Sequence, residues 1–388
     1  MEQIINSVLD TDLYKISMGN MVMMKFPDLK VRYRFIDRGD VIYPEGFDKE
    51  LTKQIKMMEN LCLTVQEKAF LEEKCDYLSP VYLDFLKGYR FDSNEVIAKQ
   101  DEKGKLTIDI EGYWYRTIYW EVPLMALVSE LYFKMTGQTA KIDKQKDIQK
   151  VKLFEKHNAY FADMGTRRRY SFDNHERIVK LFKEESNHTF VGTSNVYLGM
   201  KYDLPILGTY GHELVMVHGA LYGYKMANSL TMKNWLDIYD EGKIGTVLPD
   251  TYTTDVFLKS FNYKYASLFR NIRHDSGDPF SFTDKVIENY KKLGIDPMTK
   301  SIIFSDGLNP KLACEIKEYC VGKIKSSFGL GTNFTNDVEV KPLNIVIKIS
   351  EVFVNGEWYD AVKLSDTPGK NTGNEDEVNI CKKVLKIK

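Results

Sequence analysis

The residues that could do chemistry in this chain lie in short motifs that combine glycine with histidine, arginine or a carboxylate. One motif, GTYGHE, places His212 directly after a short apolar run and a glycine turn. An imidazole, with an ordinary pKa of about 6.5, can serve as a base, an acid or a nucleophile. Taken alone, a histidine at such a turn can equally be structural. The remaining histidines outside the motifs have no acidic partner at a useful spacing: His157, His175, His188 and His218.

Two further motifs, RHDSGDP and SDG, place carboxylates in turns that follow short apolar runs. In the first, Arg273 is a planar donor suited to a carboxylate or a phosphate, and Asp275 could accept from sugar hydroxyls. Asp278 precedes a proline and is typical of a turn residue. In the second, Asp306, followed by Gly307, could bind ribose hydroxyls or cap the helix that we expect to begin near residue 310.

Two segments are candidate anion sites. In SFGLGT, an apolar strand leads into Gly329, Gly331 and Thr332, whose N–H groups and hydroxyl suit a phosphate; a tight turn without a ligand is the alternative. In DMGTRRR, three consecutive arginines follow Met164, and they cannot all face one way. At least one should therefore be structural or at the surface. The cluster, which includes Arg167, either binds an anionic substrate or forms a solvated basic face.

The elements that must position these motifs follow from hydrophobic periodicity. Period-two alternation predicts strands near residues 31–35 and 106–110, and Pro123 opens an apolar helix. Further along, short apolar strands alternate with helices, which indicates a parallel sheet with ligands at the strand ends. The predicted strands of this part are Phe190–Gly192, Ile206–Gly208, Ile302–Phe304 and Ile324–Phe328. A helix ends at Gly294, a loop covers Ser365–Asp376, and strand-like runs occupy Leu343–Ile349, Glu351–Val354 and Trp358–Lys363.

Composition narrows the class of protein. The chain has 388 residues, 54 Lys plus Arg and 55 Asp plus Glu, so its net charge of -1 argues against a general nucleic-acid binder. Its five cysteines form no CxxC pair and share no metal-ligand spacing with histidine, which favours free thiols in a reducing compartment. The first residues do not resemble a signal peptide, and no run approaches a membrane span. We therefore expect a cytoplasmic protein with neither a membrane nor a nucleic acid as partner.

Taken together, the motifs closely resemble the nicotinate phosphoribosyltransferase family, in its shorter bacterial and fungal branch. The similar segments cover roughly residues 10–370 and include TDLYKISM, FIDRGD, DMGTRRRYS, FVGTSN, GTYGHE, RHDSGDP, SFGLGT and VKLSDTPGK. The resemblance implies an α/β protein with an irregular β/α barrel-like domain of the type II phosphoribosyltransferase kind and an α/β sandwich domain from both chain ends. We place the sandwich at residues 1–125, completed by 340–388, and the barrel-like domain at 126–339.

The resemblance also implies a reaction. Nicotinate would displace pyrophosphate from phosphoribosyl pyrophosphate (PRPP), and ATP hydrolysis would be coupled to this step through phosphorylated His212. Mg²⁺ would accompany ATP and PRPP, bound by their phosphates rather than by protein ligands, and no organic prosthetic group is expected. The same resemblance implies that the chain could form a homodimer, because in relatives the residue that matches Tyr14 can reach a neighbouring subunit's site.

Roles for individual residues follow from the resemblance. His212, Asp275 and Arg273 would be catalytic, with Arg273 pairing either with the nicotinate carboxylate or with the adjacent phosphate. Arg38 and Arg167 would bind pyrophosphate, and Asp275 and Asp306 would hold ribose hydroxyls. The segments Gly329–Thr332 and GTSN would bind the 5-phosphate and the nicotinate carboxylate, respectively. The remaining substrate contacts would be Tyr14, Met164, Thr193, Ser194, Asn195 and Gly307.

One residue departs from the family's pattern. Relatives usually have an aromatic residue at the position of Met164, where it stacks on the pyridine ring. A thioether can also pack on a ring face, so binding should persist but depend more on Tyr14. The alternatives are a nicotinamide phosphoribosyltransferase, whose relatives recognise the amide through an acidic residue, and a catalytically silent nucleotide-binding homologue. A quinolinate phosphoribosyltransferase fits less well, because those chains are shorter and lack the GTYGHE histidine.

Overall fold

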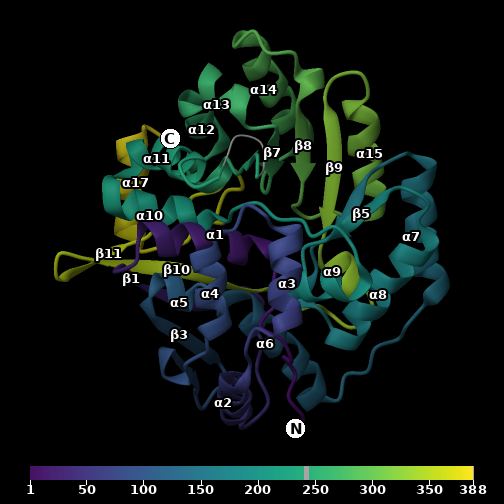
Figure 1. Cartoon of the computed structure of the whole chain (residues 1–388), viewed down its shortest axis with the longest axis vertical. Coiled ribbons are helices and arrows are strands. Elements are labelled where there is room, and N and C mark those ends of the chain that lie inside the picture. The colour runs from purple at the N-terminus through teal and green to yellow at the C-terminus, as the bar shows by residue number, and fades with distance from the viewer. Residues whose placement is uncertain (240–243, 388) are drawn as a thin grey trace. The chain divides into compact units, whose positions relative to one another are not determined.

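The computed structural model describes residues 1–239 and 244–387, and it has a mixed α/β fold, as predicted (Figure 1). The chain divides into two compact units. Unit 1 comprises Met1–Val151, Ala162–Gly208 and Leu330–Lys348, and unit 2 comprises Lys152–Phe161, Thr209–Gly329 and Ile349–Lys388. Each unit is thus assembled from three separate stretches of sequence. The predicted domain boundaries near residues 125 and 340 stay a prediction.

Unit 1 contains an antiparallel sheet in which β1 (Lys30–Asp37) pairs with β3 (Leu106–Tyr113), and β3 pairs with β2 (Val96–Gln100). Tyr33 lies opposite Ile110, and both are buried. The alternation of the sequence places every second side chain on one face of a strand, so these residues cover the sheet's apolar side. The strands predicted from alternation near residues 31 and 106 are therefore confirmed.

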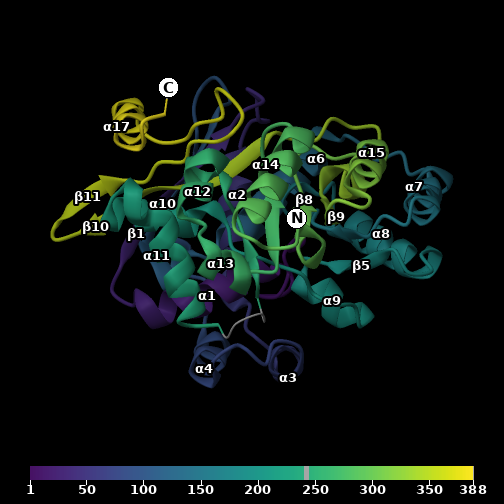
Figure 2. The same ribbon diagram turned by 90° about the horizontal axis from the view of Figure 1, so that it is seen from above.

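The helices of unit 1 surround a core to which α6 (Glu121–Thr136) contributes most of its length, because all but four of its residues are buried. Pro123 occupies its first turn, where the missing N–H costs nothing. Thr64 and Glu67 form a capping box at the start of α3 (Val65–Lys74), which packs beside α4 (Pro80–Gly88), as Figure 2 shows. The other helices with residues in this unit are α1 (Leu13–Lys25), α2 (Phe47–Met57), α5 (Trp114–Thr117), α7 (Lys144–Lys156), α8 (Phe172–Glu185), α9 (Val196–Tyr202) and α16 (Thr332–Thr335).

Unit 2 contains a parallel sheet in the order β6 (Thr246–Val247), β7 (Asn271–His274), β8 (Ser301–Phe304) and β9 (Lys325–Leu330). Figure 1 shows β7, β8 and β9 side by side, with α15 (Pro310–Cys320) next to β9. Ile272, Ile302 and Phe328 make the strands apolar and buried. Since the strands are parallel, their carboxyl ends share one edge, and the polar motifs of this unit follow that edge.

The helices of unit 2 carry clear end signals. In α14 (Pro279–Lys292), Asp278 accepts from Ser281 N at 2.7 Å as the N-cap, and Gly294 follows the helix at φ 71°, as predicted. The remaining helices are α10 (His212–Tyr222), α11 (Tyr224–Leu236), α12 (Thr254–Ser260), α13 (Tyr263–Leu268) and α17 (Glu375–Leu385), the last packing on α11. No helix among the described residues is long and apolar enough to cross a membrane. All five cysteines are free thiols.

Three predictions for strands need correction. Ile206 forms only an isolated bridge with Thr193, because Pro205 has no N–H to donate and Gly208 ends the apolar run. The tail runs that were predicted as separate strands form one strand, β10 (Ile345–Val354), since half-buried Ser350 does not interrupt it. The last run, β11 (Glu357–Asp360), ends earlier than predicted and pairs with β10 in the hairpin visible in Figure 2. The predicted loop is confirmed up to Asn374, where α17 begins.

Candidate active site

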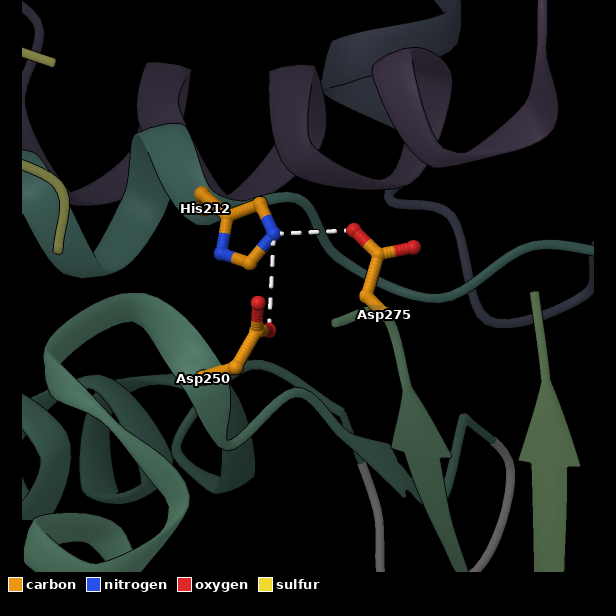
Figure 3. A group of neighbouring side chains, drawn as sticks. All are labelled: His212, Asp250 and Asp275. Carbon is orange, nitrogen blue, oxygen red and sulfur yellow. Dashed lines mark hydrogen bonds and ion pairs between the residues drawn. The ribbon is translucent and has the colours of Figure 1, made fainter. Parts of the chain in front are cut away.

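His212 is the first residue of α10 and is only 5 % exposed. Both ring nitrogens have partners. Nδ1 lies 2.9 Å from Oγ1 of Thr251. Nε2 lies 2.9 Å from Oδ2 of Asp275 (Figure 3). A second carboxylate, that of Asp250, lies 3.5 Å from the same Nε2. The local motif alone left a structural role open for this histidine. Its position between a hydroxyl and two carboxylates favours a catalytic role.

The partners of His212 fix its tautomer. A carboxylate can only accept, so Nε2 carries the proton that it donates to Asp275, and Nδ1 accepts from the hydroxyl of Thr251. Burial lowers the pKa of His212 to about 4, although the charges of Asp250 and Asp275 oppose this effect. The imidazole is therefore neutral at pH 7, which is the form that can act as a nucleophile.

Asp275 follows β7 and joins His212 to Arg273. Its Oδ1 accepts from NH2 of Arg273 at 2.9 Å and from Oγ of Ser305 at 2.9 Å. Burial raises the pKa of this carboxyl, but Arg273 and His212 together outweigh burial and hold the pKa well below its ordinary value. Asp275 is thus a permanent anion between two potential donors.

Arg273 lies in β7, not in the turn where its motif had placed it. Besides Asp275, its Nε donates to Oγ of Ser305 at 3.0 Å and its NH1 donates to Oγ1 of Thr209 at 3.1 Å. A guanidinium has five N–H groups, so these three bonds fix its plane and leave two donors for an anionic ligand. Its side chain is 14 % exposed.

Asp250 and Thr251 are site residues that the sequence motifs did not reveal. Asp250 is 1 % exposed; its Oδ2 accepts from Oγ of Ser276 at 2.7 Å and lies 3.4 Å from Nζ of Lys363, while its Oδ1 has no hydrogen-bond partner among the described residues. The two residues follow β6, which is only two residues long. The run VLPDT could have revealed these two residues, because its Asp follows an apolar strand as Asp275 and Asp306 do.

These side chains could also hold a metal ion. One ligand atom each from His212, Asp250 and Asp275 lies within 4.8 Å of the other two. Imidazole nitrogen and carboxylate oxygen are ordinary ligands for divalent cations. A metal on Nε2 of His212 would replace the proton now shared with Asp275. The expectation that Mg²⁺ is bound by substrate phosphates, without protein ligands, stays a prediction.

Asp306 lies beyond β8 and is not a helix cap. The N-cap of α15 is Asn309, whose Oδ1 accepts from Leu312 N at 2.9 Å, so the capping alternative for Asp306 is wrong. Burial raises the pKa of Asp306, and Lys370, 3.6 Å away, lowers it in part. Gly307 is exposed at φ 60°, and Gly329 is buried near the end of β9.

Unit 1 brings together a second group of predicted site residues. Oγ of Ser194 donates to Oδ1 of Asp12 at 2.8 Å, and Nε of Arg167 lies 3.7 Å from Oδ2 of the same carboxylate. The hydroxyl of Tyr14 donates to Glu121 at 3.1 Å, and the guanidinium of Arg167 lies 6.0 Å from the Tyr14 ring centroid. Arg167 is one-third exposed and lies between the carboxylates of Asp12 and Glu121, beside an aromatic ring.

The other predicted site residues of unit 1 have different surroundings. Thr193 and Asn195 are completely buried, and their side chains hold Asp163 and Asp10, respectively. Arg38 is exposed, and its backbone N–H donates to Asn344 O. Met164 is half-buried, Gly331 is the N-cap position of the short helix α16, and Thr332 begins that helix.

The structure of unit 1 tests two predictions, one for the three consecutive arginines and one for His175. Among the three consecutive arginines, Arg169 is the structural one: it is fully buried and pairs with both oxygens of Asp10 at 2.6 and 2.7 Å. The expectation that His175 has no acidic partner is wrong, because its Nε2 lies 2.7 Å from Asp163. His175 lies on α8, and Asp163, twelve positions earlier, ends β4 (Phe161–Asp163). Their spacing in the sequence does not predict that the two side chains meet in the fold. The same expectation for His157, in unit 2, is also wrong, because its Nδ1 lies 3.0 Å from Glu318.

Comparisons with known proteins agree with this arrangement. Residues 159–388 match the nicotinate phosphoribosyltransferase (NAPRTase) family, and residues 9–129 match the NAPRTase N-terminal domain. The chain is 46 % identical to nicotinate phosphoribosyltransferase of Chromohalobacter salexigens, over 99 % of both chains. It is 45 % identical to that of Desulforapulum autotrophicum, over 98 % of this chain and 99 % of the relative.

A solved structure extends the similarity to the fold. The crystal structure of nicotinate phosphoribosyltransferase from Porphyromonas gingivalis superposes with a TM-score of 0.97 at 44 % identity, covering 99 % of this chain and all of that one. The predicted fold class, a mixed α/β protein like the members of that family, is thereby confirmed. The chain belongs to the nicotinate phosphoribosyltransferase family.

Proposed function

We propose that the chain transfers the 5-phosphoribosyl group of PRPP to nicotinate, which yields nicotinate mononucleotide and pyrophosphate, a salvage step towards NAD. ATP hydrolysis is coupled to this transfer through transient phosphorylation of His212. The observation that carries the proposal is the arrangement of His212, Asp275 and Arg273, in which one carboxylate orients both a neutral imidazole and a guanidinium. Family membership supplies the reaction to which this arrangement is matched.

Phosphorylation of His212 by ATP needs a neutral imidazole and nearby positive charge. Burial keeps His212 unprotonated, and the hydrogen bonds to Thr251 and Asp275 fix the plane of its ring. As the γ-phosphoryl group is transferred, negative charge develops on the leaving ADP. Arg273, held in place by Ser305 and Asp275, has two N–H groups that can stabilise this charge.

Displacement at C1 of PRPP passes through a sugar with positive charge, so carboxylates near the ribose favour the transition state. Asp275 and Asp306 are suited to accept from ribose hydroxyls, because each follows a strand of the parallel sheet. Gly329, Gly331 and Thr332 are suited to the 5-phosphate, and Arg38 and Arg167 to pyrophosphate. Mg²⁺ accompanies ATP and PRPP and neutralises their phosphates; no organic prosthetic group is needed.

Unit 1 carries the groups that favour nicotinate over nicotinamide. Arg167, proposed above for pyrophosphate, can also donate to a carboxylate, and the hydroxyl of Ser194 can do so when it turns away from Asp12. Tyr14 and Met164 can pack on the pyridine ring. The neutral amide of nicotinamide offers no charge to pair with the guanidinium of Arg167. We further propose that the protein acts in the cytoplasm on these small molecules alone, as a homodimer.

Steady-state kinetics with nicotinate, nicotinamide and quinolinate, each with PRPP and Mg²⁺-ATP, tests the substrate. We expect kcat/KM for nicotinate to exceed the others by more than tenfold, since a charged partner distinguishes the acid from the amide by a few kcal/mol. A preference for nicotinamide or quinolinate would overturn the assignment. Turnover of none of the three would identify a silent nucleotide-binding homologue.

Incubation with γ-labelled ATP tests the coupling. We expect an acid-labile, base-stable label on the native protein, as is typical of a phosphoramidate, and no label on His212→Ala. That variant should retain a slow transfer that ATP no longer stimulates. A native protein that never becomes labelled would contradict the coupling, while leaving the transfer itself to the kinetic test.

A further inference from the structure

The carboxylate of Asp163, at the end of β4 in unit 1, is fully buried and collects donors from three elements. Its Oδ2 accepts from Nε2 of His175 on α8 at 2.7 Å and from Oγ1 of Thr193 on β5 (Phe190–Thr193) at 2.6 Å. Its Oδ1 accepts from Gly165 N at 3.0 Å, and its backbone oxygen accepts from Ser194 N at 2.8 Å. One residue therefore joins a helix, a strand and a turn.

Three of these four donors belong to the segments that carry the substrate groups. The Gly165 N–H fixes the turn between Met164 and Arg167, and the bonds from Thr193 and Ser194 fix the strand end from which Ser194 reaches Asp12. A Cβ on Gly165 would lie 2.2 Å from Cγ2 of Thr335, so the backbone there is already at its closest approach to its neighbours.

The fourth donor, His175, lies outside those segments. It is completely buried, and its ring makes one hydrogen bond, to Asp163, while its Nδ1 has no partner among the described residues. A histidine with only a structural role in the core would be expected to form hydrogen bonds with both ring nitrogens, because a buried polar atom without a partner costs free energy. Its single bond is directed at the carboxylate that organises the binding turn.

We infer that His175 is a positioning residue for substrate binding, which acts through Asp163 on the turn of Arg167 and the strand end of Ser194. This inference rests on the proposed function, because it assigns those two residues to substrate. Without the Nε2–H donor, the buried anion of Asp163 loses one of its two strong side-chain donors. Asp163 then draws on Thr193 and Gly165 alone, and the two substrate-binding segments shift with it.

The effect should fall on binding rather than on phosphorylation of His212. Asp163 and His175 belong to unit 1, whereas His212, Asp275 and Arg273 belong to unit 2 and are fixed by their own hydrogen bonds. A shift of the binding turn weakens contacts made by Arg167 and Ser194 in the bound state and in the transition state alike. KM rises in that case while kcat changes little.

The test compares two variants of similar volume in the full-length protein. In His175→Gln, the side-chain amide can place an N–H near the position of Nε2; in His175→Met, the side chain fills the same space without a donor. Val179→Ala is the control for general loosening of α8, since Val179 lies one turn further along the helix, is fully buried and belongs to an apolar cluster with Leu198 and Leu204.

We expect His175→Met to raise the KM values for nicotinate and PRPP on the order of tenfold, the size typical of a lost supporting contact, with kcat within about threefold. His175→Gln should stay close to the native values. Labelling of His212 by γ-labelled ATP should be unchanged in both. Val179→Ala should lower the melting temperature without changing either KM.

Three outcomes would overturn the inference: native KM values in His175→Met, an equal rise of KM in Val179→Ala, or a folded His175→Gln as impaired as His175→Met. If His175→Met does not fold, His175→Gln still decides, because its melting temperature and KM values must both be near native. Failure of the proposed function would look different. The native protein itself would then fail to convert nicotinate, whatever the variants do.

Discussion

The carboxylate of Asp275 lies 2.9 Å from Nε2 of His212 and accepts a hydrogen bond from its N–H. This contact determines which imidazole nitrogen is protonated, since a carboxylate cannot donate. It also places a permanent negative charge next to the ring, which would stabilise the ring when it becomes positively charged during phosphoryl transfer. The pair is therefore comparable to the carboxylate–imidazole pairs that orient a reactive histidine in other enzymes.

Replacement of Asp275 by asparagine should reduce phosphorylation of His212 by at least about a hundredfold, because the amide neither fixes the tautomer nor stabilises positive charge on the ring. The measurement is the initial rate of label transfer from γ-labelled ATP. Asp278→Asn, four positions from the strand end of β7, is the control: it replaces one good N-cap of α14 by another. Equal rates in the two variants would contradict a role for Asp275 in this step.

Acid should destabilise the protein already between about pH 6.5 and pH 4. In the folded state the pKa of His212 is lowered to about 4 by burial, whereas an unfolded histidine titrates at about 6.5. In this window the unfolded state binds more protons, so the free energy of unfolding falls as the pH falls, by roughly 3 kcal/mol for this group when the whole window is crossed.

Urea unfolding at pH 7.5, 6 and 5 measures this dependence. His212→Gln should show a shallower fall than the native protein. His218, whose pKa burial also lowers to about 4, is present in both proteins, so the difference isolates His212. The depressed pKa values of Asp10 and Asp275 contribute only at lower pH, where unfolded carboxyls become protonated. Parallel curves for both proteins would show that His212 is not titrating as described.

Replacement of Met164 by phenylalanine should strengthen nicotinate binding several-fold. An aromatic ring packed on the pyridine adds about 1 kcal/mol beyond its contact area, and a thioether provides less. Titration calorimetry with nicotinate gives the affinity. Met298→Phe, at an exposed position of unit 2, controls for the added ring and should leave the affinity unchanged. An unchanged or weaker affinity in Met164→Phe would show that residue 164 does not stack on the substrate.

Thr253→Gly should stabilise the protein. Thr253 has φ 74° and ψ 146°, a left-handed conformation that a β-branched residue adopts only under strain of about 1–3 kcal/mol. Glycine removes this strain, loses the capping oxygen at little cost, and adds about 1 kcal/mol of chain entropy to the unfolded state. A net gain of about 1 kcal/mol in urea unfolding is expected. Thr253→Ala keeps the strain and loses the cap, so it should destabilise instead; a destabilised glycine variant would mean that the strain is absent.

The sequence predicted the elements whose signals are local. Alternation revealed β1 and β3, a glycine marked the end of α14, and the polar motifs that follow apolar runs revealed His212, Arg273 and Asp275. Each of these signals lies within a few residues of the feature that it predicts, and a pattern of period two or 3.6 is legible in such a window.

The parts that the sequence did not reveal depend on contacts between distant segments. Asp250 and Thr251 contact His212 from positions 38 and 39 residues further along the chain, after a strand too short to show alternation. The pairing of His175 with Asp163 requires a helix to fold back over a strand end. Arg273 and Ser305 meet only because β7 and β8 are parallel neighbours, with Arg273 opposite Ile303. None of these contacts can be predicted from the spacing of the residues in the sequence.

The interleaving of the two units has a consequence for synthesis on the ribosome. Domains commonly fold as they emerge, the N-terminal one first. Here unit 1 needs Leu330–Lys348 and unit 2 needs Ile349–Lys388, so neither is complete before residue 348 has been made. The nascent protein must therefore keep the apolar face of β1 and β3 and the buried helix α6 from premature association while more than half of its length is still to be translated. Chaperone binding to the nascent chain is expected to matter more for this protein than for one whose domains follow each other in sequence.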